Sequence, residues 1–311
     1  METPLISIAM ATYNGERYIK EQLESILKQS YHNLEIIICD DLSNDSTVKV
    51  IEEYQRTDSR IKLFINKSNL GFKKNFEKSI LLCNGEYIAL SDQDDIWKVN
   101  KIEILMSKID SYDLIHSASS LIDENSNLIS PLWIKEDDFK YSFEKLVFGN
   151  TITGCTILLK KELLKDFSPI PNGEKYHDWW LALLASKNNG IVYEPTPLVQ
   201  YRQHAAQDTG ATVDTCYTKM KRYFNNIFCK RKSKKYAKSK QQILRLKSLL
   251  NERSSIFSNS QKEIIYDGIL YYNDYINNFF HLKTFLIGLK YKNIYFNNRY
   301  FYKNILRDLI G

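Results

Sequence analysis

Long apolar runs are missing from this sequence. No uninterrupted apolar stretch reaches about 18 residues, the length that a transmembrane helix requires, and the best candidate, residues 275–289, contains two asparagines, a histidine and a lysine. The apolar run at residues 5–11 is too short for a signal peptide and follows an acidic start. We therefore expect a cytoplasmic protein, for which peripheral contact with the inner face of the cell membrane stays open.

The sequence also lacks any CxxC pair, although it holds five cysteines. Such pairs are typical of zinc sites and redox motifs, and their absence favours reduced thiols in the core of a cytosolic protein. No internal repeat is evident. The 311 residues, with 43% hydrophobic content, suffice for more than one domain.

Charge is distributed unevenly along the chain. Residues 215–311 hold 20 Lys and Arg against 5 Asp and Glu, whereas residues 1–214 hold 23 against 32. A basic C-terminal part indicates contact with something anionic, such as a membrane surface, a lipid-linked molecule or nucleic acid. Within it, residues 219–240 interleave ten basic residues with aromatic ones, which favours an interfacial membrane helix. A solvated basic face on a helical extension is the competing interpretation.

Short apolar runs alternate with amphipathic stretches over the first 110 residues, as in βαβ units on a Rossmann-like, mostly parallel sheet with flanking helices. The predicted strands there are residues 5–11, 34–39, 61–65 and 86–90. The predicted helices are residues 16–29, 46–55, 72–80 and 99–109.

The pattern is less regular further along the chain. We predict a helix at residues 177–187, strands at 113–119 and 151–159, and no regular structure at 123–150. Short extended segments at 191–193 and 198–201 are separated by Pro195 and Pro197. Because the composition changes to Lys, Tyr, Asn and Phe beyond residue 207, we place a boundary there. The α/β domain is residues 1–207, and a basic, aromatic-rich helical extension is residues 208–311.

Three carboxylates, Asp92, Asp94 and Asp95, stand within four residues directly after the strand predicted at 86–90. Clustered like charges repel, so the cluster indicates a bound cation. Oxygen ligands suit Mg²⁺ or Mn²⁺, and magnesium typically combines one or two carboxylates with substrate phosphates. A helix cap would explain one Asp but not three. The sequence therefore predicts a metal and nucleotide-diphosphate site.

Polar residues also follow the other predicted strands, where ligands of open α/β sheets bind. Residues 11–15 and 69–71 are small or turn-forming and let a ligand approach the backbone. Asp40 and Asp41 follow the second strand, and a carboxylate there could accept the imide N–H of a pyrimidine. Helix capping would account for Asp45 or Ser46, but not for the pair Asp40-Asp41.

Two further motifs lie in the second half of the α/β domain. His177-Asp178-Trp179-Trp180 places a carboxylate at a helix start beside two aromatics, which suits a general base next to a sugar-stacking face. A capping Asp beside core tryptophans is the alternative. Arg202 and His204, in Tyr201-Arg202-Gln203-His204, could meet a diphosphate or the metal, or could lie in a solvated loop.

In their order, these motifs resemble family-2 inverting glycosyltransferases of the GT-A fold. The resemblance is closest to the bacterial rhamnosyltransferase-like branch and covers about residues 4–207. The family often has Glu-Asp where this chain has His177-Asp178, as that branch does. The motifs that carry the resemblance are Ala11-Thr12-Tyr13-Asn14-Gly15, Asp40-Asp41-Leu42-Ser43-Asn44-Asp45, Asn69-Leu70-Gly71, Ser91-Asp92-Gln93-Asp94-Asp95-Ile96-Trp97, Thr153-Gly154-Cys155-Thr156, His177-Asp178-Trp179-Trp180 and Tyr201-Arg202-Gln203-His204.

The resemblance implies a role for each matching residue. Asp178 is implied as the catalytic base, and Asp94 and His204 as ligands of Mn²⁺ or Mg²⁺. The residues implied for sugar or acceptor contact are Trp179, Trp180 and Asp95. The residues implied for nucleotide binding are Thr12, Tyr13, Asn14, Asp41, Asn69, Gly71, Asp92 and Arg202.

The implied reaction moves a sugar from a nucleotide-diphosphate donor to a glycan or lipid-linked oligosaccharide acceptor in surface polysaccharide synthesis. dTDP-L-rhamnose is the favoured donor, and a UDP-hexose is the alternative. A nucleotidylyltransferase would be expected to have a Gly-rich, basic loop where residues 12–16 stand. A nucleic-acid binder is also disfavoured, because the acidic α/β part would repel phosphate backbones. We therefore expect no nucleic-acid partner, and an anionic membrane surface remains a candidate partner.

Overall fold

The computed structural model describes residues 3–133, 141–188, 190–205, 231–277, 286–287 and 290–291. Contacts divide the chain into two compact units. The first unit comprises residues 1–136, 151–170 and 176–206, and the second comprises residues 137–150, 171–175 and 207–311. The division near residue 207 lies at the change in composition. In addition, two short segments from the α/β range join the second unit.

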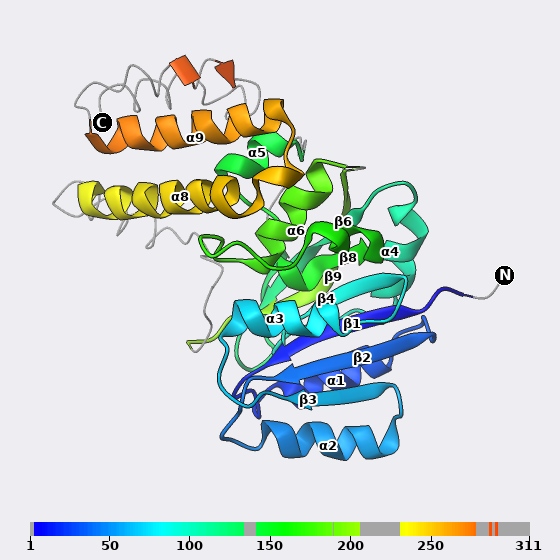
Figure 1. Cartoon of the computed structure of the whole chain (residues 1–311). Coiled ribbons are helices and arrows are strands. Elements are labelled where there is room, and N and C mark those ends of the chain that lie inside the picture. The colour runs from blue at the N-terminus through cyan, green and yellow to red at the C-terminus, as the bar shows by residue number, and fades with distance from the viewer. Residues whose placement is uncertain are drawn as a thin grey trace. The chain divides into compact units, whose positions relative to one another are not determined.

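The first unit is built on one mixed, mostly parallel sheet in the order β3-β2-β1-β4-β8-β6-β9-β5, with β7 paired to β6 (Figure 1). Its strands are β1 (Ile6–Thr12), β2 (Leu34–Asp40), β3 (Ile61–Ile65), β4 (Tyr87–Ser91), β5 (Ile96–Trp97), β6 (Leu114–Ile122), β7 (Leu128–Trp133), β8 (Ile157–Lys160) and β9 (Ile191–Arg202). β1 pairs in parallel with both β2 and β4, and β8 is antiparallel to β4 and β6. β4 and β6 therefore end at the same edge of the sheet.

Helices flank this sheet on both faces. They are α1 (Ile19–Leu27), α2 (Thr47–Thr57), α3 (Phe72–Leu81), α4 (Lys101–Ile109) and α6 (His177–Ser186). α3 packs on β1 and β2, and α1 lies beside α2, on the other side of the sheet from α3 (Figure 1). The chain moves from β1 outward to β3 and then returns past β1 to β4, so the crossover helices change face between these two steps.

The predicted α/β fold is confirmed, and each element of the first 110 residues lies within three residues of its predicted bounds except β5, which was not predicted. All seven residues of β2 are buried, as expected for a strand covered on both faces. The prediction of an irregular segment at residues 123–150 was wrong. It contains β7 and the helix α5 (Phe143–Phe148), whose short lengths leave little periodicity for a sequence pattern to reveal.

Two other predicted elements differ from the structure. The strand expected at residues 151–159 begins only at Ile157, because residues 154–156 form a single helical turn, η1 (Gly154–Thr156). The two extended segments expected around Pro195 and Pro197 are one strand, β9, whose register with β6 shifts at Pro197. Proline lacks the N–H that a regular ladder needs, so an irregular register accommodates it within the sheet.

The second unit contains α5, α8 (Arg231–Arg253), η3 (Ser254–Ile256) and α9 (Asn259–Asn277). Within it, the buried Arg245 donates from Nε to Glu174 Oε2 at 2.6 Å and from Nη1 to Val147 O at 2.9 Å. These bonds tie α8 to the two short segments that join this unit. Most of the basic segment predicted to bind membrane, residues 219–240, lies outside the described residues.

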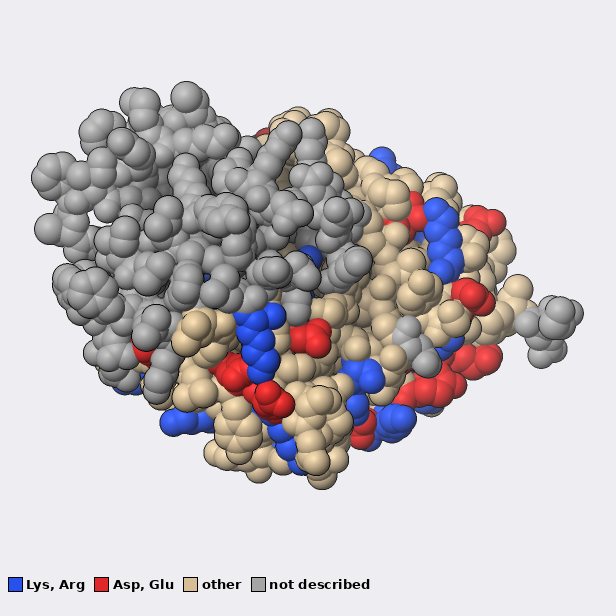
Figure 2. All heavy atoms as spheres, turned by 90° about the horizontal axis from the view of Figure 1, so that it is seen from above, with Lys and Arg blue, Asp and Glu red and all other residues tan. Residues whose placement is uncertain are grey.

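Two observations bear on partners of the described part of the chain. None of its helices is long and apolar enough to cross a membrane. On the face seen in Figure 2, the Lys and Arg side chains of the described residues alternate with Asp and Glu. The charge asymmetry of the sequence is therefore not matched by a single-sign patch among the described side chains on that face.

Glu35 is a buried carboxylate at the start of β2 that the fold keeps ionised. Its Oε1 accepts hydrogen bonds from Ser7 Oγ and from the Asn84 amide, both at 2.6 Å. Its Oε2 accepts one from Lys62 Nζ at 2.8 Å. Burial alone would raise the pKa of Glu35, but these partners together lower it to about 2. The side chain therefore joins β1, β2, β3 and the loop before β4.

We expect Glu35→Gln to lower the free energy of unfolding by on the order of 2 kcal/mol at pH 7. The folded-state pKa lies below the unfolded-state value, so the contribution is fully present above about pH 5. It is lost as the pH falls toward the folded pKa of about 2. Urea unfolding at pH 7 and pH 3 should show the two proteins converging on acidification. The exposed Glu53→Gln on α2 is the control and should change little. A gap that widens at low pH would contradict the assignment.

Candidate active site

The polar motifs of the first unit meet where β1 and β4 end side by side. β1 connects outward to β2, whereas β4 is reached from β3 on the far side of β1. Open α/β sheets form a crevice at such a switch point, beyond the carboxyl ends of the strands. Thr12 ends β1 at this place and residues 13–15 follow it, while Asp92, Asp94 and Asp95 follow β4. The topology therefore brings together motifs that are 80 residues apart in the sequence.

Four carboxylates lie close enough here to influence one another. Burial raises the pKa of Asp92 well above its usual value, and the charges of Asp95, Asp94 and Asp178 raise it further. Burial and the Asp94 charge raise the pKa of Asp95 to about 7. Only Lys101 acts in the opposite direction on Asp92. An excess of negative charge is therefore built into this end of the sheet.

Asp94 connects the acidic cluster to the end of β9. Its Oδ2 lies 2.8 Å from His204 Nε2, and its main-chain oxygen accepts a hydrogen bond from Arg202 Nε at 2.6 Å. The His204 ring packs against Tyr18, with the ring centroids 4.8 Å apart. The structure thus brings together Asp94 and His204, the two residues that the sequence implied as metal ligands.

Asp178 lies in the first turn of α6 and faces the turn η1. Its Oδ2 accepts a hydrogen bond from the Gly154 amide at 3.1 Å, and its Oδ1 accepts one from the Trp179 amide at 2.6 Å. The negative charge of Asp178 reaches Asp92, so the implied base and the acidic cluster belong to one site.

His177, the residue before Asp178, is enclosed by apolar surroundings. Its ring stacks on Phe76 with the centroids 3.8 Å apart, and neither ring nitrogen has a hydrogen-bond partner among the described residues. Burial lowers the pKa of His177 to about 3. The imidazole is therefore neutral at physiological pH and adds no charge beside the base.

The donor set of the acidic cluster fits a divalent cation. Asp92, Asp95 and Cys155 each offer one ligand atom, and these atoms lie within 4.8 Å of one another. Burial raises the pKa of the Cys155 thiol well above its usual value, and Mg²⁺ and Mn²⁺ prefer oxygen to sulfur. The carboxylates are therefore the suitable ligands, and their mutual repulsion is what a cation would relieve.

Asp41 holds the loop that precedes α3. Its Oδ1 accepts hydrogen bonds from the Leu70 amide and from Asn66 Nδ2, both at 2.7 Å, and its Oδ2 accepts one from the Gly71 amide at 2.8 Å. Asn69 reaches the main-chain oxygen of Asp41 at 3.2 Å. Three acceptor positions of the Asp41 carboxylate are thus filled within the protein, and the residue is only 2% exposed.

The loop after β1 is fixed from two sides. Asn14 donates its amide to Ser43 Oγ and accepts the Asn44 amide at its Oδ1, both at 2.9 Å. Gln93 pairs with the backbone of Tyr13, accepting its N–H at 2.9 Å and donating to its oxygen at 3.0 Å. The Asn14 side chain is therefore hydrogen-bonded to the β2–α2 loop. By contrast, the Tyr13 side chain is 47% exposed and accessible to a ligand.

Several implied ligand contacts are placed in the protein interior. Trp180 is fully buried and donates from Nε1 to Phe167 O at 2.7 Å, so it is a core residue and offers no stacking face. Asp95 is also fully buried, and its Oδ1 accepts the Arg202 amide at 3.0 Å. Trp179 is 8% exposed. Thr12 is buried and donates from Oγ1 to Asp40 Oδ2 at 2.8 Å.

Arg202, implied as a diphosphate contact, is 1% exposed and bonded within the protein. Besides Asp94, its guanidinium donates to Glu21 Oε2 at 2.5 Å and to Ser126 Oγ at 2.9 Å. It also lies over the Tyr18 ring, 4.7 Å from the centroid. Arg202 thus joins α1, the β4–β5 loop and the β6–β7 turn, and the expectation that it faces a diphosphate does not fit this position.

Sequence reasoning missed Lys101, Cys155 and Gln93 as members of the site. Lys101 is fully buried, its Nζ donates to Cys155 O at 2.6 Å, and burial lowers its pKa to about 7. Nothing in the local pattern separates this lysine from the exposed Lys98. Gln93 lies between two aspartates of the motif, and that position alone could have marked it.

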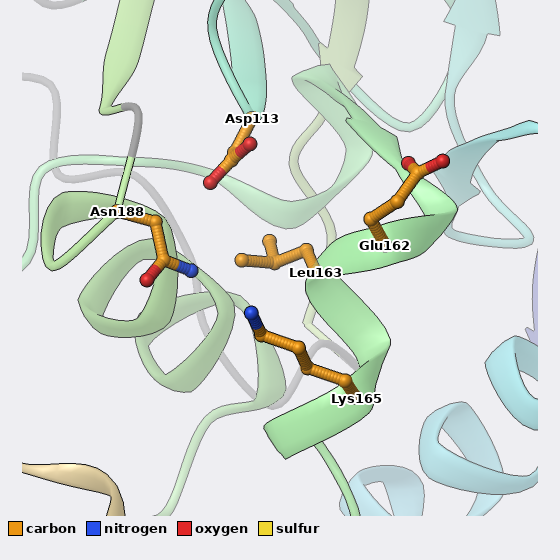
Figure 3. A pocket seen from close by; sticks show the side chains of 5 residues that line it. All are labelled: Asp113, Glu162, Leu163, Lys165 and Asn188. Carbon is orange, nitrogen blue, oxygen red and sulfur yellow. The ribbon is translucent and has the colours of Figure 1, made fainter.

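A hollow of about 370 Å³ is lined by Asp113, Glu162, Leu163, Lys165 and Asn188 (Figure 3). Asp113 and Asn188 precede β6 and β9, which are parallel to each other. Because β6 is parallel to β4, this hollow lies at the opposite edge of the sheet from the acidic cluster. It is therefore separate from the candidate site.

Comparison with known proteins agrees with this geometry. Residues 7–167 match the family described as glycosyl transferase family 2. The chain is 34% identical over 221 residues to the dTDP-rhamnosyl transferase RfbG of Shigella flexneri, an overlap that covers 66% of this chain and 74% of RfbG. It is 33% identical over 198 residues to the UDP-Glc:alpha-D-GlcNAc-diphosphoundecaprenol beta-1,3-glucosyltransferase WfgD of Escherichia coli, which covers 62% of this chain and 74% of WfgD.

The fold has a counterpart among solved structures. Residues 1–349 of TarS from S. aureus superimpose with a TM-score of 0.59 at 17% sequence identity, covering 98% of this chain and 79% of that structure. At this identity the likeness concerns the fold. It supports the GT-A architecture that the sequence predicted.

The close approach of Gly15 to Gln93 gives a test of the β1 loop. A Cβ added at Gly15 would lie 2.3 Å from Gln93 Oε1. We expect Gly15→Ala to displace that side chain from Tyr13 and to lower the free energy of unfolding by about 1–2 kcal/mol. In a Gln93→Ala background the methyl group meets no such side chain, and the same change should cost less than about 0.5 kcal/mol. Urea unfolding of all four proteins measures this coupling, and equal costs in both backgrounds would refute the contact.

Proposed function

The chain belongs to glycosyl transferase family 2, and from this premise we propose that it is a metal-dependent, inverting enzyme that moves a sugar from a nucleotide diphosphate to an acceptor hydroxyl. The observation that carries the proposal is the position of Asp178. One carboxylate projects from the start of α6 toward a cluster of three others at the end of β4. Such a transfer needs a base beside the acceptor hydroxyl on one side of the reacting carbon. On the other side it needs a metal ion that neutralises the leaving diphosphate.

Asp178 is suited to remove the proton from the acceptor hydroxyl. The Gly154 and Trp179 amides donate to its two oxygens and so fix the direction of the carboxylate. The hydroxyl oxygen then attacks the anomeric carbon from the face opposite the leaving diphosphate. One displacement forms the new C–O bond, breaks the bond to the diphosphate and inverts the anomeric configuration. The proton passes to Asp178.

Asp92 and Asp94 are the residues that we propose to hold the divalent cation, with His204 beside Asp94. Asp92 is half-buried and is the more accessible of these carboxylates, whereas Asp94 is 9% exposed and Asp95 is fully buried. The cation, Mn²⁺ or Mg²⁺, supplies positive charge for the leaving diphosphate. Arg202 supports these ligands from the protein interior, because its Nε donates to the main-chain oxygen of Asp94 and its amide donates to Asp95 Oδ1.

The nucleotide is proposed to lie over the ends of β1 and β2. We propose that the second acceptor position of Asp41 Oδ2, which already accepts the Gly71 amide, is open to the base, and that the exposed side chain of Tyr13 borders the nucleotide. Asn14, Asn69 and Gly71 shape the loops around it: Asn14 Oδ1 accepts the Asn44 amide, Asn69 Nδ2 donates to Asp41 O, and the Gly71 amide donates to Asp41 Oδ2. We propose that Asp41 and Tyr13 contact the nucleotide, and that Asn14, Asn69 and Gly71 act by holding the loops in position.

The donor is proposed to be dTDP-L-rhamnose. RfbG, a relative at 34% identity, is described as a dTDP-rhamnosyl transferase. A UDP-hexose is the second candidate, because WfgD, at 33% identity, is described as using UDP-glucose. WfgD acts on a diphosphoundecaprenol-linked sugar, which supports a lipid-linked acceptor in polysaccharide synthesis for this chain as well.

Two carboxylate variants should separate catalysis from donor binding. Asp178→Asn is expected to lower kcat by about 10²–10⁴-fold, because the general base is lost, while the donor Kd changes little. Asp94→Asn is expected to weaken Mn²⁺-dependent donor binding. Transfer rates and calorimetric titrations measure the two effects. Glu162→Gln, an exposed carboxylate at the other edge of the sheet, is the matched control. Normal turnover in Asp178→Asn would overturn the assignment of the base.

The donor can be identified by thermal stabilisation, since a ligand that binds only the folded state raises its apparent stability. We expect dTDP-L-rhamnose with Mn²⁺ to raise Tm more than UDP-glucose does, and we expect the shift to shrink without the metal. A larger shift with UDP-glucose would favour the second candidate. No shift with any nucleotide sugar, with or without Mn²⁺, would refute a nucleotide-sugar site.

A further inference from the structure

Lys101 occupies a position that is unfavourable for a lysine on two counts. Its side chain is fully buried, and removing an ammonium group from water is costly unless it is paired. It is also the first residue of α4 (Lys101–Ile109), where the partial positive charge of a helix start repels a cation. A residue that the fold holds in such a place needs a compensating interaction.

That compensation comes from the acidic cluster and its surroundings. Cys155, whose main-chain oxygen accepts the Lys101 hydrogen bond, has its thiol within 4.8 Å of carboxylate oxygens of Asp92 and Asp95, and the charges of these two carboxylates act on Lys101. Its Nζ donates to Cys155 O at 2.6 Å and lies 3.2 Å from the centroid of the Trp97 ring, whose face attracts a cation. In its protonated form, Lys101 therefore supplies positive charge from the protein itself to this cluster.

The bond to Cys155 connects Lys101 to the proposed base. Cys155 is the middle residue of the turn η1, and the preceding residue, Gly154, donates its amide to Asp178 Oδ2. A Cβ on Gly154 would lie 3.2 Å from His177 Nε2, so the turn is closely packed against the start of α6. A shift of the turn would therefore move the group that orients Asp178.

We propose that Lys101 is a positioning residue and the resident counter-cation of the site: it balances Asp92 and Asp95 from the protein side and, through Cys155, holds the turn on which Asp178 rests. The inference rests on the proposed function. It has a consequence that a purely structural lysine would not have. Because Lys101 and the divalent cation both act on Asp92 with the same sign of charge, Lys101 weakens metal binding while it supports catalysis.

The test replaces the ammonium group and measures the two effects separately. In Lys101→Met, we expect the affinity for Mn²⁺ alone, without nucleotide, to rise by about threefold to tenfold, since a nearby positive charge is removed. At saturating Mn²⁺, kcat should fall by at least about tenfold because Asp178 is less well oriented. Lys98→Met, an exposed lysine three residues earlier, should leave both values within about twofold.

A second variant separates charge from hydrogen bonding. Lys101→Gln keeps a donor for Cys155 O but no charge, so its Mn²⁺ affinity should rise as in Lys101→Met while kcat falls less. It also serves if Lys101→Met does not fold. Mn²⁺ affinity that falls together with kcat, or stays unchanged in both variants, would overturn the proposal, because a structural lysine predicts that outcome.

A metal-free measurement keeps this inference distinct from the proposed function. Without a counter-cation, the Asp95 charge should destabilise the fold, so adding Asp95→Asn should restore stability that Lys101→Met loses. Urea unfolding of the two single variants and the double variant in a chelator reports this coupling. Strictly additive losses would overturn the pairing even if sugar transfer is confirmed. Failure of wild-type protein to bind Mn²⁺ would instead refute the metal-dependent function.

Discussion

The structure around the candidate site depends on one constraint, the repulsion among carboxylates gathered at the end of β4. Asp92, Asp94 and Asp95 follow one another there, and Asp178 approaches from α6. Buried like charges of this kind persist only when other groups compensate for them. Lys101 is buried beside the cluster, and the Arg202 backbone amide donates to Asp95. A divalent cation bound at the more accessible Asp92 could neutralise the remaining negative charge. On the function proposed above, a metal and a diphosphate would relieve the repulsion that remains among these carboxylates.

The same constraint explains why many charged and polar groups of the site face inward. The Arg202 side chain donates hydrogen bonds to the β4–β5 loop, the β6–β7 turn and α1. The Asp41 carboxylate accepts hydrogen bonds from the loop before α3. Each bond removes freedom from a loop that would otherwise sample several positions, and that freedom would have to be lost when substrate binds. The loops are therefore set in place before the ligand arrives. Leu42, held at a φ of 65° between Asp41 and Ser43, is a sign of the strain that such positioning requires.

The sequence predicted the elements of the α/β unit because their periodicity is strong and their ends carry clear signals. That Asp94 and Asp178 share a site was implied by the resemblance to family-2 glycosyltransferases, whose motifs lie at strand ends and at a helix start. The sequence could not distinguish Lys101 from Lys98, because burial of a lysine depends on the turn at residues 154–156, which is distant in the chain. Nor could it show that Arg202 and Trp180 point into the interior, since a polar or aromatic residue near a site reads the same in either orientation.

Donor selection and catalysis place different demands on this site. Lys101, Asp95 and Arg202, which support the acidic cluster, are buried and hydrogen-bonded within the protein. A substitution at any one of them therefore disturbs several neighbouring residues. By contrast, Tyr13 and Leu70 are 47% and 39% exposed at the ends of the same strands and can vary at little cost to stability. Relatives at 33% and 34% identity are described with glucosyl and rhamnosyl donors. In this chain, therefore, the exposed rim of the site is where a substitution can alter the contact with a ligand without disturbing the buried groups that balance the charges.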